Sequence, residues 1–247
     1  MADVTVLKGF PTEVSEYIDL PDIGELILYP SFFDIRIEDA YKYGTEFQKY
    51  LFDKVPLRHD KKHISVLWQV RLLTPRTRSC TGVPKNGDSS REWHIDCEEE
   101  KEHIYARETD RVHLLTNKVT SPTEFLEEEV VVDKSPSTPY AEFIEYFHNN
   151  IHKFNVKPKA MEHNRIVTFT NHMHRATASK RPEFKFMMRL VETDREREPA
   201  EYHPKLHNQV DVFDADREGY VTHLVREPGK ITIYLPSINS DMLWKKE

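Results

Sequence analysis

Residues 165–190, RIVTFTNHMHRATASKRPEFKFMMRL, contain two apolar segments joined by a polar turn. The second segment alternates, with Phe184, Phe186 and Met188 at one set of positions and Lys185, Met187 and Arg189 at the other. Because successive side chains of a strand point to opposite faces, this pattern predicts a β-strand with one apolar face. The other face carries two cations, and a buried cation is costly unless an anion pairs with it. We therefore expect an anionic group opposite this face.

Short strand-like segments recur along the chain. The clearest is 63–74, which is rich in β-branched and aromatic residues. We also expect strands at 25–30, 92–96, 110–117, 123–133, 164–171, 183–192, 208–216, 219–225 and 229–237. Helical spacing predicts helices at 37–53 and 140–154, and the composition of 75–92, rich in Pro, Gly, Ser and charge, predicts a long loop. Many short strands separated by turns are typical of a sandwich or barrel, so we predict a mainly β domain with flanking helices, an α+β fold.

The composition indicates a globular domain. The 247 residues suffice for one domain with a substantial core, and we treat 1–247 as a single domain. Hydrophobic residues make up 38% and aromatic residues 11%, which excludes a largely disordered chain. The net charge of -7 argues against free nucleic acid as a partner. Glycine is scarce, and no Gly-rich phosphate-binding motif occurs.

The sequence contains no signal for a membrane or a secretory route. No stretch approaches the ~20 apolar residues that a membrane-spanning helix needs. The first residues, MADVTVLKGF, lack a basic segment followed by an apolar one. Two cysteines, Cys80 and Cys97, are too few for a disulfide framework or an all-cysteine zinc site. We therefore expect a cytoplasmic protein with no membrane partner.

The segment EWHID (92–96) places a histidine and an aspartate two residues apart. Chance alone predicts about one such pair in a chain with 13 histidines, so the spacing by itself carries no weight. On a strand, however, His94 and Asp96 share one face, while Trp93 and Ile95 point to the other. This arrangement suits two metal ligands backed by apolar packing. The alternative is a hydrogen-bonded His–Asp pair on the surface.

A metal site of this kind needs a third ligand from a distant strand. The 2-His-1-carboxylate triad of non-haem iron enzymes binds one face of Fe(II) and leaves the other positions open. His172 and His174 follow the apolar strand predicted at 164–171 and are the candidates. One of them would be the ligand and the other its neighbour.

The order of these segments resembles the Fe(II)/2-oxoglutarate-dependent dioxygenases, most closely their prolyl-hydroxylase-like branch. In that branch an HxD strand is followed by R-x-x-T-x-x-x-Y-L-N, by G-G-x-T-x-F and by H-R-V. This chain has DRVHLLTN (110–117), SPTEF (121–125) and RIVTFTNHMHRAT (165–177) in the same order, over about residues 63–192. It lacks the tyrosine of the first motif and the two glycines of the second. The match to H-R-V favours His174, which Arg175 follows, over His172.

The resemblance implies a double-stranded β-helix, a jelly-roll or cupin-like barrel, with its core at about 63–192. It also implies an Fe(II) site with three protein ligands, His94, Asp96 and His174. The distal carboxylate of the cosubstrate 2-oxoglutarate would pair with Lys185 or Arg189. With O2 as the oxidant, such a hydroxylase acts on a C–H bond of a small metabolite, an amino acid or a peptide side chain, and releases succinate and CO2.

Other interpretations of the same residues stay open. Arg71 and His172 are candidates for binding the substrate, although Arg71 also suits a salt bridge at the rim. A cupin-type metal enzyme without cosubstrate would use His113 or His172 as a fourth ligand and would not need the cations after the last histidine. In a non-enzymatic β-sandwich interaction module the histidines would be coincidental. The sequence carries no signal for an oligomeric state.

Overall fold

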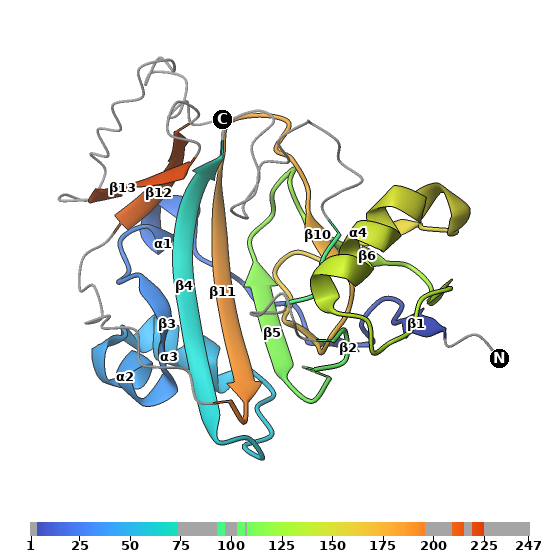
Figure 1. Ribbon diagram of the computed structural model, residues 1–247. Coiled ribbons are helices and arrows are strands. Elements are labelled where there is room, and N and C mark those ends of the chain that lie inside the picture. The colour runs from blue at the N-terminus through green and yellow to red at the C-terminus, as the bar shows by residue number, and fades with distance from the viewer. Residues whose placement is uncertain are drawn as a thin grey trace.

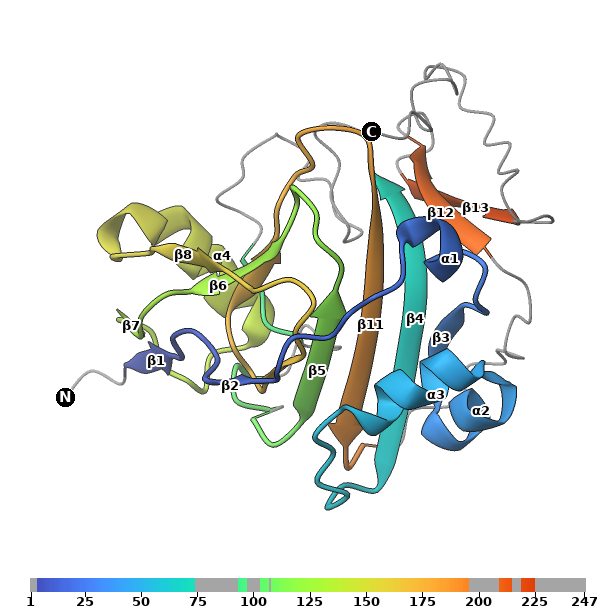
Figure 2. The same cartoon turned by 180° about the vertical axis from the view of Figure 1, so that it is seen from behind.

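The computed structural model describes residues 4–73, 93–96, 103–106, 108–195, 209–214 and 219–224. Within these residues the chain folds into mostly antiparallel sheets with helices on two sides (Figures 1 and 2). The predicted mainly β fold with flanking helices is therefore confirmed. None of the helices in this part of the chain is long and apolar enough to cross a membrane.

An eight-stranded sheet forms the body of the molecule. Its centre consists of three antiparallel strands, β4 (His63–Leu73), β11 (Glu183–Thr193) and β5 (Arg111–Thr116). Beyond β5 lie β9 (Val167–Phe169) and β2 (Glu13–Val14), and on the side of β4 lie β3 (Phe32–Arg36), β12 (Gln209–Asp214) and β13 (Gly219–Leu224). β12 runs parallel to β4. The β4–β11 pairing is the longest, and it extends from Glu183–Leu73 to Thr193–His63.

A three-stranded sheet faces this large sheet. Its strands are β10 (His174–Ala176), β6 (Thr123–Leu126) and β8 (Pro158–Ala160). Phe125 of β6 packs against Val112, Val191 and Phe169 of the large sheet, so a shared apolar core lies between the two sheets. A separate two-stranded ribbon is formed by β1 (Thr5–Leu7) and β7 (Val130–Val132).

Helices cover the outer sides of both sheets (Figures 1 and 2). The large sheet is covered by α1 (Ile23–Leu26), α2 (Ile37–Tyr43) and α3 (Glu46–Asp53). The smaller sheet is covered by α4 (Tyr140–Asn150), which continues into a 3-10 turn at Ile151–Lys153. Phe143 and Phe147 of α4 pack with Leu126 of β6. The chain is thus layered, with the two facing sheets in the middle.

The two faces of β11 serve different layers. Phe186, Met188 and Leu190 pack with Trp68 and with residues of the helices. Val191 packs instead into the core between the sheets. Because side chains alternate along a strand, Lys185 and Arg189 share the face of Val191. The cations predicted on one face of this strand therefore belong to the face that looks toward the three-stranded sheet.

Two expectations near the beginning of the chain are wrong. Residues 25–30 do not form a strand, because the Asp22 side chain accepts a hydrogen bond from the Glu25 backbone N–H at 3.1 Å and caps the short helix α1. Residues 37–53 form two helices rather than one. Thr45 and Gln48 make a capping box, which starts α3 as a new helix after α2 has ended.

Most of the other predicted elements are present, although some differ in length. Residues 123–133 contain two strands, β6 and β7, with exposed glutamates at 127–129 between them. Residues 92–96 contribute a single β-bridge, His94 to His174, rather than a full strand. The loop expected at 75–92 and the strand expected at 229–237 lie outside the described residues.

A buried ionic cluster lies on the helix-facing side of the large sheet. Glu192 is buried, and its Oε1 accepts hydrogen bonds from Arg111 Nε at 2.9 Å and His113 Nε2 at 3.0 Å. Its Oε2 accepts from the backbone N–H groups of Arg58 and His59, both at 3.1 Å. Burial by itself would raise the pKa of Glu192, but the hydrogen bonds, led by that of Arg111, lower it to about 2. The cluster ties the segment before β4 to the sheet.

We expect Glu192→Gln to lower the free energy of unfolding at pH 7 by ~3 kcal/mol, because it removes the buried anion that Arg111 and His113 contact and leaves Arg111 only the exposed Asp60. The folded pKa of about 2 lies below the ordinary value of 4.5, so this contribution is present above about pH 4.5 and is lost as the pH falls toward 2. Urea denaturation across this range should show wild type and variant converging. Glu162→Gln, which breaks an exposed pair with Arg165, is the control and should change stability little. Equal losses in both variants would contradict the prediction.

Candidate metal centre

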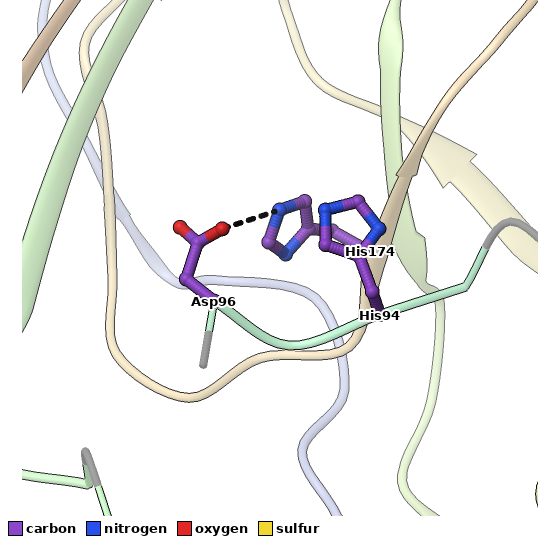
Figure 3. Close-up of side chains that lie close together, drawn as sticks. All are labelled: His94, Asp96 and His174. Atoms are coloured by element: carbon purple, nitrogen blue, oxygen red, sulfur yellow. Dashed lines mark ion pairs between the residues drawn. The ribbon is translucent and has the colours of Figure 1, made fainter. Parts of the chain in front are cut away.

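Three potential metal ligands meet at the inner side of the three-stranded sheet. Nitrogen atoms of His94 and His174 and a carboxylate oxygen of Asp96 all lie within 4.8 Å of one another. Figure 3 shows the two imidazole rings beside each other, with the Asp96 carboxylate turned toward them. His94 and Asp96 come from the segment 93–96, and His174 begins β10. The structure thus brings together two positions that are about eighty residues apart in the chain.

The backbone explains why these side chains converge. His94 and His174 exchange two backbone hydrogen bonds, each 2.8 Å long, and their ring centroids lie 4.4 Å apart. The extended segment 93–96 then puts His94 and Asp96 on one side and Trp93 and Ile95 on the other. Trp93 and Ile95 are buried in the core beneath α4. The apolar positions of EWHID hold the segment down, and its polar positions face the site.

His174 is oriented by its surroundings. Its Nδ1 lies 3.0 Å from the backbone oxygen of His172, and since a carbonyl only accepts, the proton sits on Nδ1. Its Nε2 lies 3.7 Å from Asp96 Oδ1 and keeps a lone pair. Burial, together with the nearby His94, lowers the pKa of His174 to about 4. At neutral pH the ring is therefore neutral, which is the form that binds metals.

A cation of the facing sheet approaches the same carboxylate. Arg189 Nη1 of β11 lies 3.9 Å from Asp96 Oδ2. Asp96 is thus one anion opposite this strand face, and a bound cosubstrate as its anion stays a prediction. Two imidazoles and one carboxylate form a ligand set typical of Fe(II), and of zinc in catalytic sites. This cluster can bind a metal ion.

Lys185 lies deeper between the sheets. It is among the largest fully buried side chains, and its Nζ donates a hydrogen bond of 2.7 Å to the backbone oxygen of Ser121. It shares its strand face with Arg189, two alternations further along β11. Because β11 lies between β4 and β5 and Lys185 is buried, this lysine is not a surface residue of an edge strand.

Arg71 lies next to Lys185 in the β4–β11 register. On the other side of β4, Asp211 of β12 holds the corresponding register position. Arg71 is half-buried on the inner face of the large sheet, near the end of β4. Its role, in substrate binding or in a salt bridge at the rim, stays a prediction.

The structure places two other candidate histidines outside the cluster. His172 accepts a hydrogen bond on Nδ1 from the Thr170 backbone N–H at 3.2 Å, and it lines a polar cavity of about 470 Å³ with Glu13 and Arg111. Burial lowers its pKa to about 4, with a contribution from Lys8. His113 bonds Thr168 Oγ1 and Glu192 through its two ring nitrogens, on the helix-facing side of the sheet. Neither histidine joins the three ligands of the cluster.

Two polar residues that sequence reasoning missed occupy the same inner face. Gln69 of β4 and Thr116 of β5 both pair with Met187 in the register, one row from Lys185. Both side chains are buried, and Gln69 Oε1 and Thr116 Oγ1 make no hydrogen bond within the described part of the chain. A buried polar atom without a partner costs ~1–3 kcal/mol. Their only sequence signal is a polar residue at an inward position of an apolar strand.

Comparison with protein-family models, curated proteins and solved structures found no match for this chain.

We expect the wild-type chain to bind about one Co(II) or Fe(II) ion, and alanine at His94, Asp96 or His174 to weaken binding more than ~100-fold, because even outer-shell changes cost 10–100-fold at metal sites. Anaerobic titration followed by metal analysis measures this. The matched control is His172→Ala, two residues from a ligand but outside the cluster. Wild-type affinity in all three ligand variants would show that the histidines are coincidental.

Proposed function

We propose that this chain is an Fe(II)- and 2-oxoglutarate-dependent oxygenase that hydroxylates a C–H bond of a small metabolite, an amino acid or a peptide side chain. The observation that carries the proposal is the meeting of His94, Asp96 and His174 opposite a strand face that bears Lys185 and Arg189. A dicarboxylate cosubstrate could pair its distal carboxylate with one of these inward cations, although Arg189 also lies beside Asp96.

The three ligands suit iron chemistry. Two histidines and one carboxylate leave several coordination positions open, which an enzyme needs if cosubstrate and O2 are to reach the same metal. Iron bound there would couple the oxidative decarboxylation of 2-oxoglutarate by O2 to hydroxylation of the substrate, with succinate and CO2 as products. Arg189 would orient the Asp96 carboxylate, and Nδ1 of His174 would stay fixed by the backbone of His172.

The inner face of β11 offers a site for the cosubstrate. Lys185 is the stronger candidate for the distal carboxylate. Arg189 already lies against Asp96, whereas Lys185 is fully buried nearer the start of β11. The Thr116 hydroxyl, buried and without a partner in the described residues, lies one row away and could donate a second hydrogen bond. A carboxylate there would accept hydrogen bonds from the Lys185 ammonium and the Thr116 hydroxyl, and it would give the hydroxyl the partner that it lacks within the described residues.

The proposal also includes the type of fold and the residues that would contact the substrate. Two facing sheets with a shared core and the metal ligands at their inner side suit a double-stranded β-helix. Arg71 and the Gln69 amide lie on the same inner face, on β4, and would contact the substrate. His172 faces a different cavity, so its proposed role in substrate binding receives no support from the geometry.

We expect the iron-loaded chain to form succinate from 2-oxoglutarate, and Lys185→Met to weaken 2-oxoglutarate binding at least ~10-fold, since a hydrogen bond to a charged group is worth ~1.5–3 kcal/mol. Calorimetry measures binding, and a succinate assay with candidate substrates measures turnover. Lys159→Met, an exposed lysine of β8, is the control and should bind as wild type does. If metal-loaded protein neither binds nor consumes 2-oxoglutarate, the proposal is wrong and a cosubstrate-free metal enzyme replaces it.

A further inference from the structure

Helix α4 contacts the metal-ligand segment through hydrogen bonds as well as apolar packing. The Tyr140 hydroxyl accepts a hydrogen bond from the backbone N–H of Ile95 and donates one to the backbone oxygen of the same residue, both 3.0 Å long. His148, eight residues further along α4, approaches the backbone oxygen of Trp93 with its Nε2 at 2.9 Å. Since a carbonyl only accepts, Nε2 of His148 is the donor. These contacts flank His94 on both sides.

The segment is held both by backbone pairing and by side-chain packing. On the inner side, the backbone of His174 pairs with His94 through two hydrogen bonds. On the outer side, Trp93 and Ile95 are 1% and 2% exposed and pack in the core beneath α4. Ile95 lies between the two ligands His94 and Asp96, so a shift of its peptide groups moves both side chains. The Tyr140 hydroxyl thus holds the backbone of the residue that joins the two ligands.

We propose that Tyr140 is a positioning residue of the metal centre, which sets the mutual placement of His94 and Asp96 by holding both backbone groups of Ile95. The inference rests on the proposed metal site. Metal affinity depends on ligand geometry within a few tenths of an ångström, and groups that hold ligands without touching the metal affect affinity strongly. Without the hydroxyl, the N–H and carbonyl of Ile95 lose their partner in a buried place, and the segment relaxes toward other contacts.

The chain contains a matched control for this contact. The Tyr105 hydroxyl makes the same pair of hydrogen bonds to one residue, accepting from the Val6 N–H at 3.2 Å and donating to the Val6 oxygen at 3.1 Å. Val6 belongs to β1, which carries no metal ligand. Tyr140→Phe and Tyr105→Phe therefore remove the same atom from the same pair of hydrogen bonds, which is partly buried at Ile95 and exposed at Val6. Of the two contacts, the one at Ile95 lies beside the candidate metal ligands.

The experiment is an anaerobic titration of the full chain with Co(II), whose visible spectrum reports ligand geometry. We expect Tyr140→Phe to bind Co(II) ~10-fold more weakly with a changed spectrum, in the range seen for outer-shell substitutions. Tyr105→Phe should match the wild type in both affinity and spectrum. His148→Phe, which removes the contact to Trp93, should weaken binding in the same direction but less. If Tyr140→Phe does not fold, as judged by urea denaturation, His148→Phe carries the test.

The outcomes separate the inference from the proposed function. If Tyr140→Phe binds Co(II) within about twofold of wild type and with the same spectrum, the positioning role is wrong while the metal site stands. An equal loss in Tyr105→Phe would also overturn it, because a general loss of stability would then explain both. If the wild-type chain binds no Co(II), the metal centre itself is refuted and Tyr140 has nothing to position.

Discussion

The long antiparallel pairing of β4 with β11 is the constraint on which the other layers depend. It fixes, over its whole length, which side chains of the large sheet face the helices and which face the smaller sheet. A shift by one residue would exchange Phe186 and Met188 for Lys185 and Arg189 in the helix-facing core, at a cost that no local rearrangement could offset. The same register places Arg189 beside Asp96 and places Lys185 between the sheets. Packing and site chemistry are therefore specified by one pairing.

Two polar residues of the inner face, Gln69 and Thr116, are destabilising for the folded chain. Gln69 and Thr116 are buried with side-chain oxygens that have no partner in the described residues, whereas the Glu192 cluster on the opposite face satisfies both carboxylate oxygens. A sheet selected only for stability would carry apolar residues at these inward positions. Trp68 Nε1, on the helix-facing side, also has no partner in the described residues, so such atoms occur on both faces of the sheet.

Much of this arrangement could be predicted from the sequence, for reasons that differ by element. The alternation in 183–192 and the apolar run in 63–74 predicted β11 and β4, because strand periodicity is strong in long segments. His94, Asp96 and His174 were singled out by spacing and by a motif resemblance, and they do lie together. Residues 25–30 and 37–53 were misassigned because side-chain caps at Asp22 and Thr45 outweighed the local pattern. Gln69, Thr116 and Tyr140 were missed because their importance depends on pairing across strands and packing against a helix, which one sequence does not display.

The wide sequence separation of paired strands has a consequence for how the chain acquires its structure during synthesis. β1 pairs with β7, and β2 pairs with β9. The first two strands therefore cannot pair until more than a hundred further residues have been synthesised. Likewise, His94 cannot pair with His174, nor β4 with β11, until those later segments have been synthesised. Pairings between distant segments close slowly, because loop entropy is lost before contacts form. A nascent chain would therefore hold only half of the candidate metal site, and β4 would lack its longest partner strand, until His174 and β11 have left the ribosome. Metal loading would then follow folding rather than direct it.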